Sequence, residues 1–301
     1  MSNHFPSLLP GILAGDRKAL ARAISLVENS VEGYETFLKQ LPVVHPPVIG
    51  ITGPPGAGKS TLVDALIGYW AAQGKSIGVL CVDPSSPFNL GALLGDRIRM
   101  SDWYTHPQVF IRSLATRGSL GGLHPHILEI TDIMKVAGFD FIIVETVGVG
   151  QSEVEIAGLA DTTVVVVVPE AGDEVQTMKA GLMEIADVFV VNKADRPDAD
   201  LFARNLRLMM APAFQSKKHE IAIVKTEAHH KKGIEDLANA IENHLQSATD
   251  NDRRYWLLAE KAWHLVVQKR MRNITKEKLR NAILNEGADG LNLYRFVERF
   301  G

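Results

Sequence analysis

The residues best suited to chemistry form a glycine-rich segment between an apolar run and a helical pattern. They are Gly53, Pro54, Pro55, Gly56, Ala57, Gly58, Lys59 and Ser60, followed by Thr61. The spacing G-x-x-x-x-G-K-S/T, after a strand and before a helix, is typical of a loop whose backbone N–H groups surround phosphate oxygens. We expect Lys59 to reach the β- and γ-phosphates, Ser60 to ligate Mg²⁺ and Thr61 to touch the α-phosphate. The segment therefore predicts a nucleoside triphosphate site.

A second polar motif closes a later apolar run. Asn192, Lys193 and Asp195 form an N-K-x-D pattern at the end of the run. An Asp carboxylate there can accept hydrogen bonds from N1–H and from the 2-amino group of guanine, whereas adenine carries neither donor. A desolvated and unpaired carboxylate costs roughly 1–3 kcal/mol or more, so such a site discriminates against adenine. The motif predicts a preference for guanine nucleotides.

The segment after the next apolar run is expected to back the base. Thr226, Glu227 and Ala228 follow that run, and their backbone N–H groups could face guanine. This assignment departs from the usual pattern at Glu227, where serine is commoner in such loops.

Acidic residues at the ends of two other strands predict a Mg²⁺ site. The strand 139–144 runs into Glu-Thr-Val-Gly, the order of the acidic residue and glycine that follow a Walker-B strand. We expect Glu145 to hold a Mg²⁺-bound water and the Gly148 N–H to contact the γ-phosphate, a contact whose loss releases a switch loop. Asp83 and Asp96 follow the second strand, and either could bind Mg²⁺ directly or through water. The alternatives are a turn-forming Asp-Pro at Asp83 and a helix N-cap at Asp96.

The group that usually orients the attacking water is missing from its place. In Ras-like GTPases a glutamine directly follows this glycine, and here the position holds Val149. A valine cannot orient water, so we predict slow intrinsic hydrolysis. Gln151 is a modest substitute, and the missing group could come from another loop or another protein.

Short apolar runs alternate with helical patterns over residues 47–250. The predicted strands are Val48–Thr52, Ile77–Val82, Val109–Ile111, Phe139–Val144, Thr163–Val168, Val188–Asn192 and Ile221–Val224. Most are continuously apolar, as expected when helices cover both faces of a sheet. Helical patterns between them include Lys59–Ala72, Leu123–Ala137 and Leu201–Met210. This alternation predicts an α/β fold with a doubly wound, mainly parallel sheet, here a P-loop GTPase domain.

Helical patterns flank this domain on both sides. Residues 1–46 predict an N-terminal helical arm, in which Asp16 caps a helix that carries apolar residues at helical spacing, and a second short helix is expected at 35–39. Residues 251–301 predict a C-terminal helical segment. Its first helix carries an apolar stripe at steps of three and four, and two shorter helices follow with a break near Gly287. The members of the stripe are Trp256, Ala259, Trp263, Val266 and Val267. The stripe packs either on the chain's own nucleotide-binding domain or on a second copy in a dimer.

Composition narrows the class of protein. Of the 301 residues 46% are hydrophobic and 22% charged, which is ordinary for a globular protein, and the formal net charge is −3. No strong overall field favours nucleic acid or an anionic membrane, so we expect neither as a partner. No secretory signal is visible, and no apolar run reaches the ~18–20 residues that span a bilayer. The expected location is the cytoplasm. Cys81 lies in an apolar run and is expected in the core.

Most histidines and arginines outside these motifs are expected to have no part in binding or catalysis. His124 with His126, and His229 with His230, lack the spacing of a metal site and are expected to be solvated. A group of basic residues near the third strand is expected to lie on the surface or in salt bridges, with one of them able to meet a phosphate or a partner's carboxylate. These are Arg97, Arg99, Arg112 and Arg117.

Several motifs together resemble one family. They are Glu145-Thr-Val-Gly-Val-Gly-Gln-Ser-Glu153, Val-Asp83-Pro-Ser-Ser, Leu-Gly-Asp96-Arg, Arg117-Gly-Ser-Leu-Gly-Gly122 and Asn192-Lys-Ala-Asp195. With them the chain is similar to the MeaB/ArgK family, the GTPases associated with methylmalonyl-CoA mutase, over roughly residues 10 to 270. The first of these runs is far rarer by chance than a P-loop.

The resemblance implies a homodimeric, Mg²⁺-dependent GTPase that binds GTP and GDP. It also implies a chaperone role toward an adenosylcobalamin-dependent acyl-CoA mutase, with methylmalonyl-CoA mutase the expected partner. In that family GTP binding and hydrolysis gate delivery of the cofactor and protect or reactivate the mutase. Asp83 and Asp96 carry over as the acids near Mg²⁺.

A further segment carries over from the family as Gly172 to Lys179. The resemblance implies that it is mobile, couples the nucleotide to the mutase and can supply catalytic groups, with Asp173, Gln176 and Lys179 as the matching residues. From its residues alone the segment is only a polar loop after a strand. The implied catalytic set is Lys59, Glu145, Gln176 and Lys179.

The chain departs from the family pattern in places. Glu170 stands where the family usually has glycine, and His124-Pro125-His126 interrupts a helix start that is usually richer in Ala, Arg and Thr. The C-terminal arm is short. Two other functions stay open at this point. A metallochaperone-like GTPase would need metal ligands, and the chain has no Cys/His cluster. A kinase or transport ATPase would prefer ATP, which the N-K-x-D motif argues against.

Overall fold

The computed structural model describes residue 5 and residues 7–83, 100–117, 123–148, 152–169, 180–214, 221–247, 251–287 and 291–300. Several predicted residues lie outside this described part of the chain. They are Asp96, Arg97, Arg99, Val149, Gln151, Glu170, Asp173, Gln176 and Lys179. By its internal contacts the chain divides into two units, Met1–Asp250 and Asn251–Gly301.

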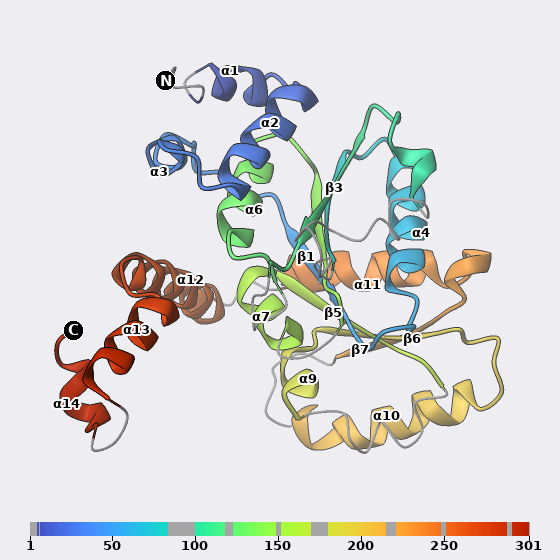
Figure 1. Cartoon of the computed structure of the whole chain (residues 1–301). Coiled ribbons are helices and arrows are strands. Elements are labelled where there is room, and N and C mark those ends of the chain that lie inside the picture. Colours follow the sequence, from blue (N-terminus) through green and yellow to red (C-terminus); the bar gives the residue numbers. More distant parts are fainter. Residues whose placement is uncertain are drawn as a thin grey trace. The chain divides into compact units, whose positions relative to one another are not determined.

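The first unit is built on a seven-stranded sheet in the order β3-β2-β4-β1-β5-β6-β7, in which neighbouring strands pair in parallel (Figure 1). The strands are β1 (Val48–Thr52), β2 (Ile77–Asp83), β3 (Val109–Ala115), β4 (Phe141–Glu145), β5 (Thr162–Val167), β6 (Val188–Asn192) and β7 (Ala222–Thr226). The five strands β1, β2, β4, β5 and β6 are buried along their whole length, as their unbroken apolar sequences predict. The predicted parallel α/β sheet is confirmed.

One strand is longer than its apolar pattern. The prediction ended the third strand at Ile111, whereas β3 continues through Arg112 and Ser113 to Ala115. Because β3 is an edge strand, the side chains of Arg112 and Ser113 are only partly buried, and polar residues are tolerated there. Strands at the centre of the sheet are buried and do not tolerate such polar side chains in the same way.

The central position of β1 creates a switch point in the sheet. After β1 the chain builds β2 and β3 on one side, returns to insert β4 beside β1, and then continues to β5 on the other side. The loops after β1 and β4 therefore emerge side by side at the carboxyl edge. In open α/β sheets ligands bind in the crevice at such a point.

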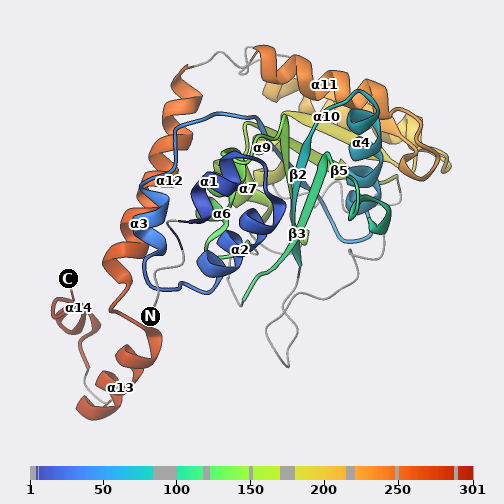
Figure 2. The same ribbon diagram turned by 90° about the horizontal axis from the view of Figure 1, so that it is seen from above.

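Helices cover both faces of the sheet, as Figures 1 and 2 show. One face carries α4 (Lys59–Ala72), the short helix η1 (Ser101–Trp103) and α11 (Ile234–Ser247). The other face carries α6 (Ile127–Lys135), α7 (Ser152–Leu159), α9 (Ala180–Ile185) and α10 (Ala199–Phe214). Two indole N–H groups tie the first layer together, because Trp70 donates to Glu242 at 2.8 Å and Trp103 donates to Asp64 at 2.7 Å. Cys81 is buried in this core, as predicted.

Three N-terminal helices, α1 (Leu8–Leu13), α2 (Arg17–Glu28) and α3 (Tyr34–Leu38), form a further layer outside α6. Asp16 caps α2 as predicted, since its carboxylate accepts the Lys18 N–H at 2.8 Å. Buried side chains of α2 belong to the same apolar cluster as those of α6 and the sheet. The arm is thus part of the folded core of the first unit.

The second unit contains α12 (Asn251–Met271), α13 (Lys276–Glu286) and α14 (Leu293–Val297). Three helices with a break at Gly287 agree with the sequence pattern. Three large apolar side chains of α12, Leu258, Trp263 and Val266, are 50%, 64% and 46% exposed. No helix among the described residues is both long enough and apolar enough to cross a membrane.

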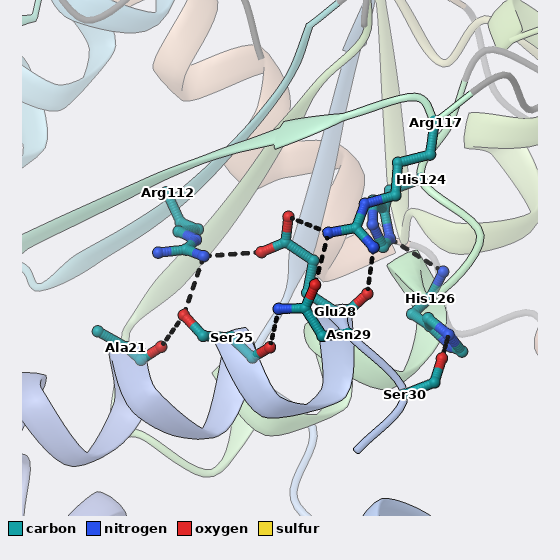
Figure 3. A network of polar contacts seen from close by, with 9 residues as sticks. All are labelled: Ala21, Ser25, Glu28, Asn29, Ser30, Arg112, Arg117, His124 and His126. Atoms are coloured by element: carbon teal, nitrogen blue, oxygen red, sulfur yellow. Dashed lines mark hydrogen bonds and ion pairs between the residues drawn. The ribbon is translucent and has the colours of Figure 1, made fainter. Parts of the chain in front are cut away.

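The prediction that His124 and His126 are solvated is wrong. His124 is 1% exposed and His126 is 8% exposed. The His124 Nδ1 accepts the His126 backbone N–H at 3.0 Å, and the His126 ring bonds the Ser30 hydroxyl at 2.8 Å (Figure 3). This side-chain turn also explains why α6 begins at Ile127 rather than at the predicted Leu123.

Burial lowers the pKa of His124 from 6.5 to about 4. Glu28 opposes this shift, whereas the positive charges of Arg117 and Arg112 and the neighbouring His126 add to it. An unfolded chain therefore binds the proton first as the pH falls. The contribution of neutral His124 to the free energy of unfolding is fully present above pH 6.5. It is lost as the pH falls from 6.5 to about 4.

We expect the His124→Asn variant to lose part of the acid sensitivity of the fold. Asn keeps an acceptor for the His126 N–H but does not titrate. Urea unfolding at several pH values should show wild-type stability falling by up to about 2 kcal/mol more than that of the variant between pH 7 and pH 4. His45→Asn, at an exposed histidine, is the control and should keep the wild-type slope. Equal slopes for His124→Asn and wild type would contradict this origin of the pH dependence.

Candidate functional site

The loop between β1 and α4 is shaped by glycines in conformations that other residues rarely adopt. Gly53 has φ +140° and Gly58 has φ +87°. A Cβ atom on Gly53 would lie 2.1 Å from the Val166 carbonyl oxygen, and one on Gly58 would lie 2.5 Å from the Asn192 side-chain nitrogen. The loop therefore packs against β5 and β6 at distances that only glycine allows.

Lys59 extends along this loop and is buried. Its ammonium donates to the carbonyl oxygens of Gly53 at 2.9 Å, Pro54 at 3.1 Å and Val147 at 3.5 Å. Three carbonyl groups thus hold the positive charge between the P-loop and the loop after β4. Together with the first N–H groups of α4, this charge makes the loop suited to an anion.

The loop after β4 meets the P-loop at Gly148, which has φ +84°. A Cβ atom here would lie 2.1 Å from the Gly53 carbonyl oxygen and 2.5 Å from the Lys59 nitrogen. Thr146 fixes the same loop to β1, because its hydroxyl donates to that of Thr52 at 2.9 Å. The glycine predicted to sense the γ-phosphate therefore lies directly against the lysine predicted to bind the phosphates.

Two of the predicted metal ligands are in direct contact. The Ser60 hydroxyl donates to Glu145 Oε1 at 2.7 Å, and both side chains are buried. Asp83, also buried, ends β2 two positions beyond Cys81, the residue that pairs with Glu145. Ser60, Glu145 and Asp83 thus come from three neighbouring elements at one edge of the sheet.

Asn192 joins three loops by hydrogen bonds. Its amide nitrogen donates to the Ala57 carbonyl at 2.9 Å, while its side-chain oxygen accepts from the Thr226 hydroxyl at 3.0 Å and from the Ala228 N–H at 3.2 Å. The side chain is 2% exposed. It therefore holds the P-loop, the N-K-x-D segment and the loop after β7 at a fixed spacing.

A pocket of about 250 Å³ opens beside this junction. Asp195, which is exposed, lines the pocket together with Lys193 and with residues 227–230, including the short helix η2 (Ala228–His230). Ligand pockets usually measure about 300–1,000 Å³, so this one suits a base better than a whole nucleotide. Thr61, predicted to touch the α-phosphate, lines the same pocket from the first turn of α4.

The segment after β7 differs in detail from the prediction. The Ala228 N–H is bound to Asn192, and the Glu227 N–H donates to the Lys232 carbonyl at 3.1 Å. These two N–H groups are therefore already hydrogen-bonded within the protein and are not free to donate to a base. A hydrogen bond from Lys232, helped by His230, holds the pKa of Glu227 below its usual value. The segment thus supplies walls and a charged rim to the pocket.

The residues present fit a guanine nucleotide with Mg²⁺. The P-loop has no room for a Cβ atom at Gly53 or Gly58, and Asp195 provides an acceptor at the pocket. No group of three or more His, Cys, Asp or Glu residues in the described part of the chain could hold a metal ion by itself. Mg²⁺ commonly binds through one or two carboxylates, substrate phosphates and water, and Ser60 with the nearby acids suits that mode.

Some contributors to the pocket carry no clear signal in the sequence. Arg196 and His229 line it, although neither belongs to a recognised motif. Lys193 adopts φ +56°, a left-handed conformation that the presence of a lysine does not predict. Only the turn that follows β6, together with the bridge between Glu227 and Lys232, brings these residues to the pocket.

A family model described as methylmalonyl Co-A mutase-associated GTPase MeaB matches residues 20–286. The chain belongs to the MeaB family. It is therefore a P-loop GTPase that binds guanine nucleotides and hydrolyses GTP. The resemblance of its motifs to this family is confirmed.

Relatives extend across bacteria, archaea and animals. A protein of Pyrococcus horikoshii that is named as a GTPase is 48% identical over 261 residues, which are 84% of this chain and 80% of the relative. GTPase ArgK of Escherichia coli is 36% identical over 237 residues, 75% of this chain and 72% of that protein. The mitochondrial methylmalonic aciduria type A homolog of Caenorhabditis elegans is 36% identical over 208 residues, 62% and 51% of the two chains.

A solved structure shares the fold of this MeaB-family chain. The crystal structure of a LAO/AO transport system kinase matches with a TM-score of 0.67 and 24% sequence identity. The match covers 100% of this chain and 98% of the other. At this level of identity the likeness shows the fold alone.

The Gly148→Ala variant should lose GTP hydrolysis by at least about tenfold, because its Cβ would displace Gly53 or Lys59. Gly74→Ala is a matched control, since Gly74 has φ +79° and open space around its Cα. The control should lose about 1–2 kcal/mol of stability, because Ala must adopt the same left-handed conformation, and should retain turnover. Single-turnover hydrolysis and thermal unfolding measured on both variants would separate the two effects, and equal turnover in both would refute the steric argument.

The Asp195→Asn variant tests the base pocket. We expect GTP affinity to fall by roughly 10–100-fold, because the acceptor for N1–H and the 2-amino group is lost. Affinity for xanthosine triphosphate should rise, since the xanthine 2-oxo group accepts from the new amide. Competition against a fluorescent guanine nucleotide measures both affinities. Unchanged GTP affinity would place Asp195 away from the base.

Proposed function

We propose that this GTPase is a Mg²⁺-dependent G-protein chaperone for an adenosylcobalamin-dependent acyl-CoA mutase, with methylmalonyl-CoA mutase as the first partner to test. The family match over residues 20–286 carries the proposal, because the family description names association with that mutase. The relative named for methylmalonic aciduria type A supports it. Gating of cofactor delivery, and protection or reactivation of the mutase, are the parts of this role that experiment must establish.

The proposed phosphate chemistry rests on charge and position. Lys59 would leave the carbonyl groups that hold it and meet the β- and γ-phosphate oxygens, which are stronger acceptors. Gly148 lies against Lys59, and its N–H would contact the γ-phosphate and lose that contact after hydrolysis. The loop after β4 would thus change its contacts according to whether GTP or GDP is bound.

Four residues would hold the Mg²⁺ ion: Ser60, Glu145, Asp83 and Asp96. When bound, Mg²⁺ neutralises charge that develops on the phosphates. The Ser60 hydroxyl would exchange its bond to Glu145 for the metal, which leaves the Glu145 carboxylate to orient a metal-bound water. Asp96 lies outside the described residues and stays a prediction.

The water-orienting group is proposed to come from outside the loop after β4. Val149 cannot serve, so intrinsic hydrolysis should be slow. Gln176 and Lys179, both outside the described residues, are the candidates that the family resemblance implies. A partner that brings these side chains to the nucleotide would accelerate hydrolysis, which would couple the nucleotide to the mutase.

We also propose that the chain is a homodimer. The exposed apolar side chains of α12 support this assignment, because a helix of this length rarely leaves an aromatic and several aliphatic side chains in water. Packing of the same stripe on the chain's own nucleotide-binding domain is the alternative.

The deciding experiment measures GTP hydrolysis by the purified chain, alone and with an adenosylcobalamin-dependent mutase encoded in the same genome. We expect slow turnover alone and at least a tenfold acceleration with the mutase. Lys59→Ala should abolish turnover in both cases and so exclude a contaminating GTPase. A CoA enzyme without cobalamin is the partner control. Turnover unchanged by the mutase, with no complex formed, would refute the chaperone role and leave GTP hydrolysis intact.

A further inference from the structure

The end of helix α2 is held by an arginine that lies two residues beyond β3. The Arg117 guanidinium donates to the Glu28 backbone carbonyl at 2.9 Å and to the Asn29 side-chain oxygen at 3.0 Å, and it pairs with the Glu28 carboxylate at 3.2 Å (Figure 3). Glu28 is the last residue of α2. A cation at this place satisfies a terminal carbonyl and interacts favourably with the helix dipole.

The same carboxylate binds a second arginine from β3. Arg112 donates to Glu28 at 2.7 Å and to the Ser25 hydroxyl at 3.1 Å. The side chain of Glu28 is 13% exposed, so its charge is compensated by both guanidinium groups rather than by water. The N-terminal arm is therefore fixed to β3 at two positions.

The two arginines differ in the position and conformation of their backbones. Arg112 lies within the strand, where its backbone pairs with Leu80 of β2. Arg117 lies beyond the strand and has φ +48°, a left-handed conformation that costs a non-glycine residue on the order of 1 kcal/mol or more. Its side-chain bonds to α2 offset that cost and fix the direction in which the chain leaves β3.

Arg117 is adjacent to a contact with the proposed metal site. The backbone N–H of Thr116 donates to the Asp83 carbonyl at 3.0 Å, and Ala115 is the register partner of Asp83. The position of Asp83 at the carboxyl end of β2 thus depends on the final residues of β3. A chain of direct contacts runs from α2 through Arg117 and Thr116 to Asp83.

We propose that Arg117 is a positioning residue for the Mg²⁺ site, and that the N-terminal arm, through Glu28, is the element that holds it. The inference rests on the assignment of Asp83 to Mg²⁺ under the proposed function. Arg117 itself touches neither the metal nor the nucleotide in this scheme. It sets the backbone that presents the Asp83 carboxylate.

The test compares Arg117→Gln with Arg112→Gln. Both remove one guanidinium from Glu28, so both should lower the thermal unfolding temperature to a similar extent. The second readout is Mn²⁺ binding to the protein with GDP, titrated by electron paramagnetic resonance. If both arginines were purely structural, the two variants would have the same Mn²⁺ affinity. We expect at least a fivefold weaker Mn²⁺ affinity for Arg117→Gln and wild-type affinity for Arg112→Gln.

Two further variants keep the outcomes distinct. Arg117→Lys should restore part of the Mn²⁺ affinity, and it serves in place of Arg117→Gln if the latter fails to fold. Asp83→Asn tests the underlying assignment. If Asp83→Asn leaves Mn²⁺ affinity unchanged, the metal assignment fails, and the positioning proposal falls with it. If Asp83→Asn weakens Mn²⁺ binding while Arg117→Gln and Arg112→Gln behave alike, only the positioning proposal is overturned.

Discussion

The site depends first on the parallel pairing of β1 between β4 and β5. Parallel strands present their carboxyl ends at one edge, so the loops after β1 and β4 are forced into contact. That contact is close enough to require glycine at Gly148, while Gly53 must be glycine because of its contact with Val166 of β5. The backbones of the two loops are thus packed directly against each other at this point.

Buried hydrogen bonds then fix the spacing of the loops that the sheet brings together. Asn192 joins the P-loop to the end of β7, and Ser60 joins α4 to the end of β4. Each of these side chains is nearly excluded from water, where a lost hydrogen bond costs more than at the surface. The N-K-x-D asparagine thus acts as a structural link within the site, while Asp195 is exposed at the pocket.

The two flanking helical regions relate differently to the nucleotide-binding domain. The N-terminal arm shares an apolar cluster with α6 and the sheet, and it holds the end of β3 through Glu28. The C-terminal unit folds as a separate set of helices with exposed apolar side chains on α12. An arm built into the core can transmit strain to the site, whereas exposed apolar surface suits association with another surface.

The sequence by itself determined the strands, the glycine-rich loop and the N-K-x-D motif, because apolar runs and motif spacing are local properties of the chain. Two strands, β1 and β6, and helix α4 have the predicted bounds. Tertiary structure decided what local patterns cannot encode. It buried His124 and His126, which had been expected in solvent, extended β3 along the edge of the sheet, and engaged the N–H groups of Glu227 and Ala228 within the protein. These outcomes depend on partners far away in the sequence, such as Ser30 for His126 and Asn192 for Ala228, and a partner's distance in space is fixed only when the layers pack.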